Sequence, residues 1–391
     1  LDAQNFTTAT NSYNVAVGAA AGGAVTTGVQ NTLIGALAGD ALTDADKNVA
    51  VGRSALTSDT LGSKSTAIGY SALDTQNFTS ATDSHNTAVG HLAGTAVTIG
   101  VANTLIGSLA GDALTDADIN VAIGHNALST DTLGSRSVAV GYEALLSQNF
   151  TTATSTYNTA VGGQAGRAVT TGVNNTLIGG LVGDAMTTGN GNTAVGKDSM
   201  GGGVVTGDFN TVLGQAAGFA LTSGDNNLFL GLDAGRTGSP GGNMSTASNI
   251  IILGNQNITD ANIQVDWTVA SDARDKADFT ALDLGLDFVK ALAPVTYKWD
   301  KRANYGDKTA EDYDLNNQTP DGTHKEDWLD IGFKAQEVEA LEIAAGYNKS
   351  NKTNLISSHT SDGKQMGLQY SKFVPILVKA IQEQNALIEA L

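Results

Sequence analysis

Residues 86–90 read Asn-Thr-Ala-Val-Gly, and this phrase or a close variant occurs fourteen times before residue 255. Its closing glycines are Gly18, Gly35, Gly52, Gly69, Gly90, Gly107, Gly124, Gly141, Gly162, Gly179, Gly196, Gly214, Gly231 and Gly254. Most neighbouring glycines are separated by the same short interval. A short fixed period is typical of a solenoid, in which one coil alone cannot bury its apolar face. The phrase therefore predicts a rod of 17-residue coils over residues 1–256.

The residues inside the phrase predict a short strand in every coil. The position before the glycine is always Val, Ile or Leu, and the position two residues earlier is usually Thr or Val. Alternating β-branched residues favour a strand. We expect each strand to end at its glycine, with Val17, Ile34 and Val51 pointing into the core. The glycine itself suits a positive φ or a close backbone approach.

Two further positions of the phrase repeat with the coil. Asn stands four residues before the glycine, except at Ser65, Ser137 and Ile250. Asparagines that recur on successive coils predict a stacked ladder of amide side chains. Alanine usually follows three residues after the glycine, as at Ala38 and Ala55. A small residue at this place indicates a tight inner corner.

A second, 72-residue period is superimposed on the first. The stretch Gln4 to Thr10 returns almost unchanged at 76–82 and again at 148–154. Each return enlarges one loop, which carries an aromatic pair. These pairs are Phe6 with Tyr13, Phe78 with His85, and Phe150 with Tyr157. The phenylalanines have two readings at this stage: exposed rings that stack on sugars, or caps on the core of the rod.

These repeats resemble the head domain of YadA-type trimeric adhesins, in which a similar Asn-x-(Val/Ala)-x-Gly phrase ends each inner strand. The resemblance covers roughly residues 10–256. It implies a left-handed parallel β-roll that trimerises, because one thin roll has too little core. Coils in that family are usually somewhat shorter than the coils of this chain. The alternative is a monomeric β-solenoid of different handedness.

Composition excludes several functions. The chain has 391 residues, no cysteine and a formal net charge of −18. It can therefore form no disulfide scaffold or thiolate metal site, and its acidity disfavours binding to nucleic acid. No apolar run approaches the ~20 residues of a membrane span, so we expect no membrane insertion. Glu143 is the single glutamate before residue 270, which argues against a glycosidase built on a glutamate pair.

The repeats stop after Gly254, and a second set of blocks begins. They are 271–276 (Ser-Asp-Ala-Arg-Asp-Lys), 292–299 (Leu-Ala-Pro-Val-Thr-Tyr-Lys-Trp), 332–339 (Gly-Phe-Lys-Ala-Gln-Glu-Val-Glu) and 370–375 (Tyr-Ser-Lys-Phe-Val-Pro). In this order they resemble the endosialidase-type intramolecular chaperone at the C-terminus of phage tail spikes and tail fibres. The resemblance covers residues 268–391. It implies a domain that trimerises, assists folding of the upstream fibre and then cuts itself off before a serine.

The resemblance also implies which residues cut the chain. The Ser-Asp-x-Arg-x-Lys motif of the family falls on Ser271, Asp272, Arg274 and Lys276, and the cleavage site falls between Ala270 and Ser271. A serine needs a base to become a nucleophile, and no histidine lies near in the sequence. Lysine serves as that base only if its pKa falls from about 10.4 toward neutrality. The sequence departs from the motif at Asp275, usually hydrophobic, and at Asp278; a carboxylate there would favour a charged lysine.

The chain ends in a predicted helix with an apolar seam. The residues at 4-3 spacing are Phe373, Leu377, Ala380, Gln384, Leu387 and Leu391, with Ile381 and Ile388 beside them. This pattern predicts a short trimeric coiled coil with one polar layer at Gln384. The alternative is an amphipathic helix that packs on its own domain.

Together these features predict a mainly β protein: a rod (1–256), a linker with the cleavage junction (257–270) and a small α+β chaperone domain (271–391). We expect the distal tail fibre of a bacteriophage, homotrimeric, made in the host cytoplasm and working outside the cell on the virion. Its partners would be a bacterial surface receptor and upstream fibre or baseplate proteins, without metal or organic cofactor; calcium at the Asp-rich loops stays open. The alternatives are a tail-spike depolymerase, which needs paired carboxylates in a groove, and an adhesin of a cell or injection particle.

Overall fold

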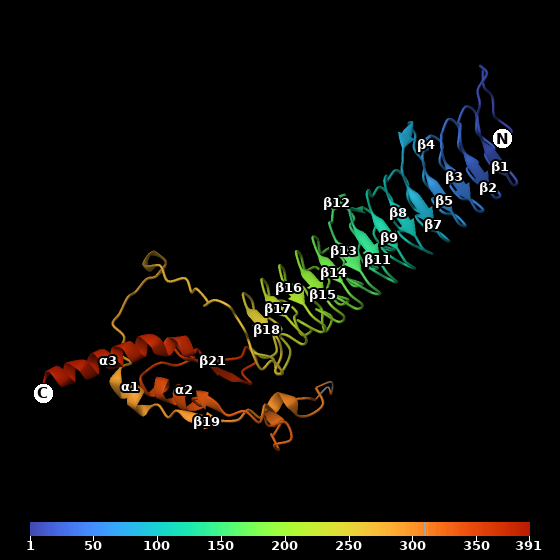
Figure 1. Ribbon diagram of the computed structural model, residues 1–391. Helices are drawn as coiled ribbons and strands as arrows, with labels where there is room; N and C mark the ends of the chain where they lie inside the picture. Colours follow the sequence, from blue (N-terminus) through green and yellow to red (C-terminus); the bar gives the residue numbers. More distant parts are fainter. Residues whose placement is uncertain (309, 311) are drawn as a thin grey trace. The chain divides into compact units, whose positions relative to one another are not determined.

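The structure, a computed structural model, describes residues 1–308, 310 and 312–391. Its largest feature is one parallel sheet of fourteen strands, each three residues long (Figure 1). In order across the sheet the strands are β1 (Val15–Val17), β2 (Thr32–Ile34), β3 (Val49–Val51), β5 (Thr66–Ile68), β7 (Thr87–Val89), β8 (Thr104–Ile106), β9 (Val121–Ile123), β11 (Val138–Val140), β13 (Thr159–Val161), β14 (Thr176–Ile178), β15 (Thr193–Val195), β16 (Thr211–Leu213), β17 (Leu228–Leu230) and β18 (Ile251–Leu253).

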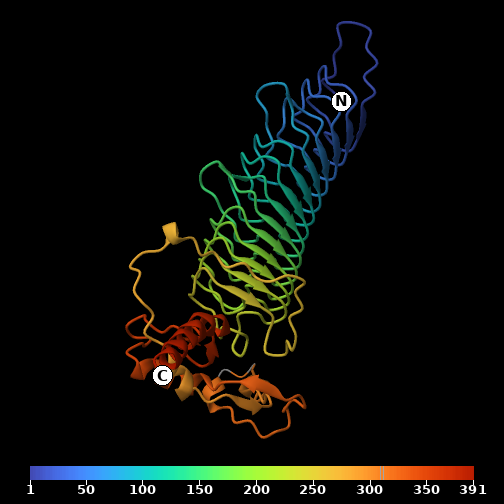
Figure 2. The same ribbon diagram turned by 60° about the vertical axis from the view of Figure 1, so that its left-hand side comes forward.

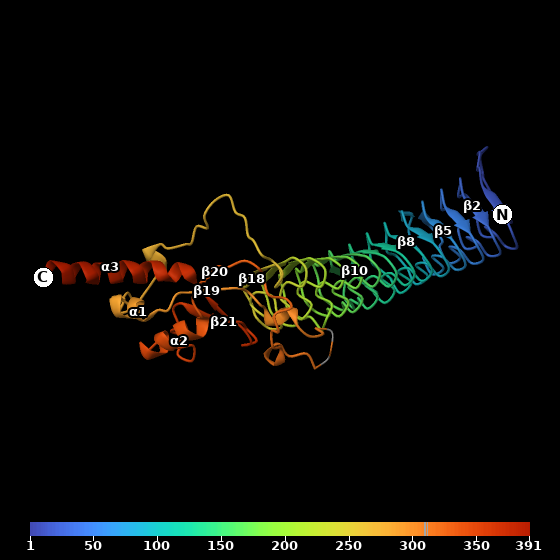
Figure 3. The same ribbon diagram turned by 60° about the horizontal axis from the view of Figure 1, so that its bottom comes forward.

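Each coil contributes one strand to this sheet, in register with the next. Thr104 pairs with Val121 and Leu105 with Ala122, for example, so the register advances by one repeat. The strands lie side by side along the whole rod (Figure 3). The predicted mainly β solenoid of 17-residue coils is confirmed, and each strand ends immediately before its glycine.

The prediction of which strand residues point inward was wrong. From β2 onward the central residue of every strand is buried, as at Leu33 and Ala50, which are both 0 % exposed. The residues on either side of it face outward: Val17 is 58 % exposed and Ile34 is 39 % exposed. The central residue and the residue before the glycine are both apolar, although the outward residue that opens a strand is often Thr, so the alternation alone did not say which set lies inside. The outward residues therefore form an apolar face along the sheet.

The repeated glycines satisfy both demands expected of them. Gly18 has φ +131, and a Cβ placed on it would lie 2.5 Å from the carbonyl oxygen of Gly35. The same close approach recurs coil after coil, because each glycine stacks on the next. Any side chain there would force neighbouring coils apart. Ala38 and Ala55 are fully buried at the predicted inner corner.

The predicted asparagine ladder is present: some stacked side chains bind each other directly, as Asn210 does when it donates to the Asn192 side-chain oxygen at 3.0 Å, and the asparagines also bind the backbone. The Asn31 side-chain oxygen accepts the backbone N–H of Asn48 at 2.9 Å, and the Asn31 amide donates to the carbonyl oxygen of Ala45 at 2.7 Å. Asn103 repeats both contacts, accepting from Asn120 at 2.9 Å and donating to Ala117 at 2.7 Å. Each asparagine thus satisfies buried backbone groups that have no strand partner.

Ser65 interrupts this ladder, and the enlarged loop repairs it. The amide of buried Gln76 donates to Ser65 Oγ at 2.8 Å, while its oxygen accepts from the Asn86 amide at 2.9 Å. The same Gln76 amide donates to the buried Asp59 carboxylate at 2.6 Å. The next set repeats the arrangement with Gln148, so in two of the three enlarged loops a glutamine bridges two coils.

The enlarged loops project from one side of the rod (Figure 2). Two of them add short strand pairs, namely β4 (Gly62–Ser63) with β6 (Thr82–Asp83), and β10 (Gly134–Ser135) with β12 (Thr154–Ser155). Phe78 and Phe150 are only 4 % and 7 % exposed, so these rings cap the core and are not free to stack on sugars. Tyr157 remains 55 % exposed.

The chain divides into two compact units. The rod comprises Leu1–Arg236 and Ser245–Leu253, and the C-terminal unit comprises Thr237–Met244 and Gly254–Leu391. The C-terminal unit contains η1 (Ala273–Asp275), α1 (Leu286–Ala291), β19 (Val295–Tyr297), η2 (Arg302–Asn304), η3 (Leu315–Asn317), β20 (Asp330–Gly332), α2 (Ala335–Ala344), β21 (Ser357–His359), β22 (Met366–Leu368), η4 (Tyr370–Lys372) and α3 (Phe373–Glu389). Strands β19 and β20 form one antiparallel pair, and β21 and β22 form another.

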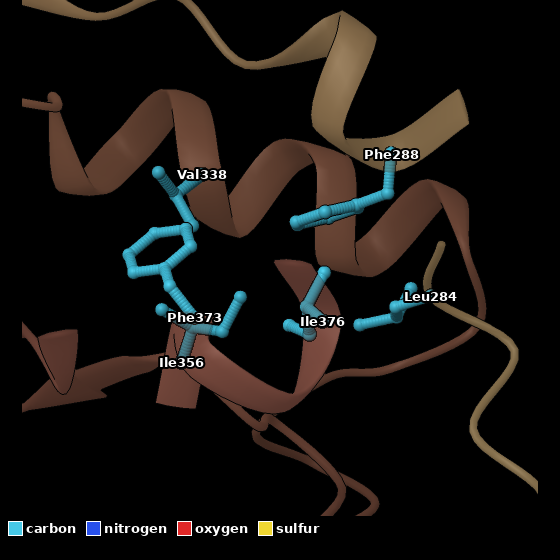
Figure 4. Close-up of a cluster of buried hydrophobic side chains, with 6 residues drawn as sticks. All are labelled: Leu284, Phe288, Val338, Ile356, Phe373 and Ile376. Carbon is cyan, nitrogen blue, oxygen red and sulfur yellow. The ribbon is translucent and has the colours of Figure 1, made fainter. Parts of the chain in front are cut away.

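A small core holds the C-terminal unit together. Its buried side chains point toward one another in Figure 4 and come from α1, α2, α3 and the segments before α1 and β21. They are Leu284, Phe288, Val338, Ile356, Phe373 and Ile376. Buried Glu342 on α2 accepts hydrogen bonds from the backbone N–H groups of Ile356 and Ser357, which fixes α2 to the segment before β21.

The predicted seam of α3 is only partly correct. Phe373 and Ala380 were assigned to it, but together with Ile376 they pack on their own domain. Most of the exposed apolar positions follow a different register with 3-4-3-4-3 spacing, although Val378 and Leu387 are also exposed. This register consists of Val374, Leu377, Ile381, Gln384, Ile388 and Leu391, and we call it the α3 stripe. The helix therefore has one apolar face against its own domain and another in solvent, because it is apolar over more than half of its circumference.

Candidate self-cleavage site

The junction that carries the predicted cleavage site is exposed throughout. Every residue of 257–281 is exposed, including Ala270, Ser271 and Lys276. Within the described chain, no backbone hydrogen bond is recorded for residues 261–271. The first regular backbone structure after this segment is the short turn η1, which begins at Ala273.

That turn brings Ser271 and Lys276 together. The side chain of Asp272 caps η1 by accepting the backbone N–H of Arg274 at 2.9 Å, and the backbone N–H of Lys276 closes the turn on the Ala273 carbonyl oxygen. After one turn, Lys276 Nζ lies 2.6 Å from Ser271 Oγ. This is the distance across which a neutral amine would accept the hydroxyl proton.

The remaining motif residues form a pair of their own. The Arg274 guanidinium contacts both carboxylate oxygens of Asp272, with the shortest distance 2.6 Å. This hydrogen-bonded pairing lowers the pKa of Asp272 and raises the pKa of Arg274. The Asp272 carboxylate thus binds Arg274 and the backbone of the turn, while the Lys276 amine contacts Ser271 Oγ.

The two unusual carboxylates do not contact the lysine. Among the residues that the structure describes, no ion pair joins Asp275 or Asp278 to Lys276. Asp275 is the last residue of η1, and Asp278 has φ 57 in the chain that leads away from the turn. The Lys276 amine is exposed, so within the single chain nothing removes it from water.

Elsewhere, no group of three or more His, Cys, Asp or Glu side chains in the described part of the chain is placed to hold a metal ion. Over that same part, no helix is both long and apolar enough to cross a bilayer.

The sequence did not reveal the buried Asp59–Gln76 pair or its equivalent Asp131–Gln148. The equal spacing of Asp and Gln in the two sets was the signal that could have indicated them.

Part of the C-terminal unit matches a known protein family. Residues 271–347 match the family described as chaperone of endosialidase, and the match begins at Ser271 itself. A comparison with curated proteins gives no match. A solenoid rod of 17-residue coils, followed by a domain that matches the endosialidase chaperone family, fits a tail fibre or tail spike with a C-terminal chaperone domain.

Proposed function

We propose that this chain is the distal, receptor-binding part of a bacteriophage tail fibre, and that its C-terminal domain assembles three copies and then cleaves the chain before Ser271. The observation that carries the proposal is the 2.6 Å contact between Lys276 Nζ and Ser271 Oγ at the first residue of the chaperone match. The cleavage is an act of the chain on itself, so no turnover enzyme is assigned to the rod.

Two exposed apolar surfaces support a homotrimer. The outward face of the rod includes Ile106 and Leu213, which are 37 % and 51 % exposed, and the equivalent residues of the other strands are at least partly exposed. The α3 stripe adds a second such surface, with Ile381 and Ile388 more than 60 % exposed. Large contiguous apolar surfaces of this kind are typical of protein interfaces. Further copies of the chain would bury both surfaces.

The cleavage chemistry follows from the positions of the motif residues. Neutral Lys276 takes the proton of Ser271 Oγ, and the oxygen attacks the carbonyl carbon of Ala270. The new C–O bond forms as the bond between that carbon and the Ser271 nitrogen breaks, and the lysine returns its proton to the leaving nitrogen. Water then hydrolyses the ester, which frees the Ala270 carboxylate and restores the Ser271 hydroxyl.

Assembly would control the timing of this reaction. A lysine becomes a base at neutral pH when burial disfavours its charged form. Lys276 is exposed in the single chain, so burial must come from neighbouring copies. Cleavage then follows trimerisation, and the chaperone leaves only after the fibre has folded.

Receptor binding is assigned to the exposed tips of the enlarged loops. Gln76 and Phe78 are buried inside the rod and cannot contact a receptor. Residues 79–83 are therefore the part of this loop to which we assign receptor contact. Replacing 79–83 with Gly and Ser should leave the trimer intact and weaken attachment to host cells. Unchanged attachment would place the receptor site elsewhere.

The cleavage proposal is tested by mass spectrometry of the purified full chain. Wild type should release residues 271–391, while Ser271→Ala and Lys276→Ala should remain full length. Ser271→Ala should still trimerise, as measured by light scattering, because folding and cleavage are separate tasks of the domain. If wild type stays intact, Asp275→Leu should restore cleavage; failure of both would remove Ser271 and Lys276 as a working pair.

A further inference from the structure

The segment immediately before the cleavage site has the pattern of a strand but lies in no sheet. Ile263, Val265, Trp267 and Val269 alternate with Gln264, Asp266 and Thr268. Such strict alternation is typical of a half-buried strand. In the structure the four apolar side chains are 52 %, 72 %, 72 % and 79 % exposed, respectively. The segment follows an open arc, clear of β19 and α2 (Figures 1 and 3).

The C-terminal unit also contains a groove of matching character. It is open, has a volume of about 580 Å³ and lies along the two-stranded sheet β19–β20. Its lining includes Val295, Thr296, Ile331 and Phe333 and carries no charged side chain. Ile331 is 77 % exposed, and the preceding Trp328 and Leu329 are also exposed. With only two strands, the sheet has edges at which another strand can pair; on the β20 edge the N–H groups of Ile331 and Phe333 already donate to Asp330 Oδ1 and Tyr370 Oη.

We propose that residues 263–269 of one copy dock as an added strand in the β19–β20 groove of a second copy. The segment and the groove are both exposed and uncharged on the contacting side, and among the described residues the backbone of 261–271 has no backbone partner, so a strand added to the sheet would satisfy it. Strand addition would hold Ala270 and Ser271 in an extended form beside the turn that carries Lys276. The inference rests on the proposed cleavage, because it explains how assembly would start the reaction.

The docking itself is tested by disulfide formation, since the natural chain has no cysteine. Two Ser271→Ala chains are expressed together, one with Trp267→Cys and the other with Ile331→Cys. A disulfide between them, seen on a non-reducing gel and by mass spectrometry, can arise only between copies. The matched control replaces Trp267→Cys with Thr268→Cys, which lies on the opposite face of the strand and should give no bond. Absence of the Trp267 bond overturns the proposal.

A second measurement separates docking between copies from docking within one chain. One Ser271→Ala chain carrying both Trp267→Cys and Ile331→Cys should run as linked copies when oxidised. A closed monomer would overturn the proposal. These results do not depend on cleavage, so they stand even if wild type proves uncut and the proposed function fails.

The effect on the reaction is measured in chains that retain Ser271. Trp267→Ser should slow release of residues 271–391 by about tenfold or more while the trimer persists, because the scissile bond is no longer positioned. Thr268→Ser should leave the rate unchanged. Equal rates for Trp267→Ser and wild type would overturn the link between docking and cleavage.

Discussion

The rod and the C-terminal unit both expose apolar side chains, but only the rod satisfies its backbone within one chain. Along the rod, asparagines such as Asn31 and Asn103 bind the buried backbone of the next coil. In the C-terminal unit, residues 261–271 have no recorded backbone partner, and α3 presents an apolar stripe to solvent. Within one chain the rod thus satisfies its backbone along its axis, whereas the C-terminal unit leaves residues 261–271 and the α3 stripe exposed.

The largest effect should separate the two faces of one strand. Leu105→Asp places a charge inside the coil, where Leu105 is 0 % exposed, and should unfold the rod at a cost of several kcal/mol. Ile106→Asp, one residue later, faces outward and should leave the coil folded but prevent trimer formation. Circular dichroism and light scattering distinguish the two outcomes. Equal unfolding by both variants would contradict the assigned faces.

The next effect tests the ladder that sets the rod apart. Asn103→Ala leaves the Asn120 N–H and the Ala117 carbonyl oxygen buried without partners, at about 1–3 kcal/mol for each group. Urea unfolding should show this loss as a lower midpoint. The control is Asn77→Ala, at an exposed position of the enlarged loop, which should change the midpoint little. A stable Asn103 variant would show that water replaces the amide.

A smaller effect decides the register of α3. Ile388 belongs to the α3 stripe, whereas its neighbour Leu387 belonged to the seam predicted from sequence, and both are exposed. Ile388→Lys should weaken trimer formation by about tenfold, or 1.4 kcal/mol, and Leu387→Lys should weaken it less. Sedimentation equilibrium measures both. The reverse order would restore the original seam.

The smallest effect is a pH dependence inside the rod. Burial raises the pKa of Asp59 above its ordinary 3.8, although hydrogen bonds from Gln76 and the backbone oppose the shift. The folded rod therefore binds a proton more readily than the unfolded chain, and Asp59's contribution to stability should increase as the pH falls from neutral toward 3.8. Unfolding free energies measured across this pH range should change with pH at different rates in wild type and in Asp59→Asn.

Asp83 provides a control of opposite sign. Its exposed carboxylate pairs with Lys64, which lowers its pKa. Its contribution is present above pH 3.8 and is lost as the pH falls through the lowered value. In Asp83→Asn the unfolding free energy should no longer decrease from this source as the pH falls. If Asp59→Asn and Asp83→Asn change the pH dependence of the unfolding free energy in the same direction, the burial of Asp59 does not cause its effect.

The sequence was sufficient for the features that depend on the spacing of the repeats. The spacing of the glycines indicated the coil, the strand ends and the close approach of Gly18 to Gly35. It was insufficient where two apolar choices were equivalent, as for Leu33 against Ile34, and for the two faces of α3. Those choices depend on which side the chain turns after each strand, and single-residue chemistry does not encode that.

The candidate site was predictable as a list of residues but not as an environment. The motif named Ser271 and Lys276, and one turn is enough to place them at 2.6 Å. Lys276 is exposed and, among the described residues, has no contact with Asp275, because the whole segment 257–281 is exposed. The spacing of residues in the sequence did not predict this exposure. Gln76 was visible in the 72-residue repeat, yet its bridging role required the Ser65 interruption to be seen in space.

The bridging glutamine also makes the rod a structure of adjustable length. Gln76 and Gln148 occupy identical surroundings, so a 72-residue block joins itself at both ends with the same contacts. Recombination that duplicates or deletes one block would change the length of the rod by about 19 Å, four strand spacings, and the new junction would have the same contacts as the existing ones. Loss of a single coil would separate Ser65 from its glutamine. The rod could therefore lengthen or shorten in whole 72-residue blocks while it keeps the same fold.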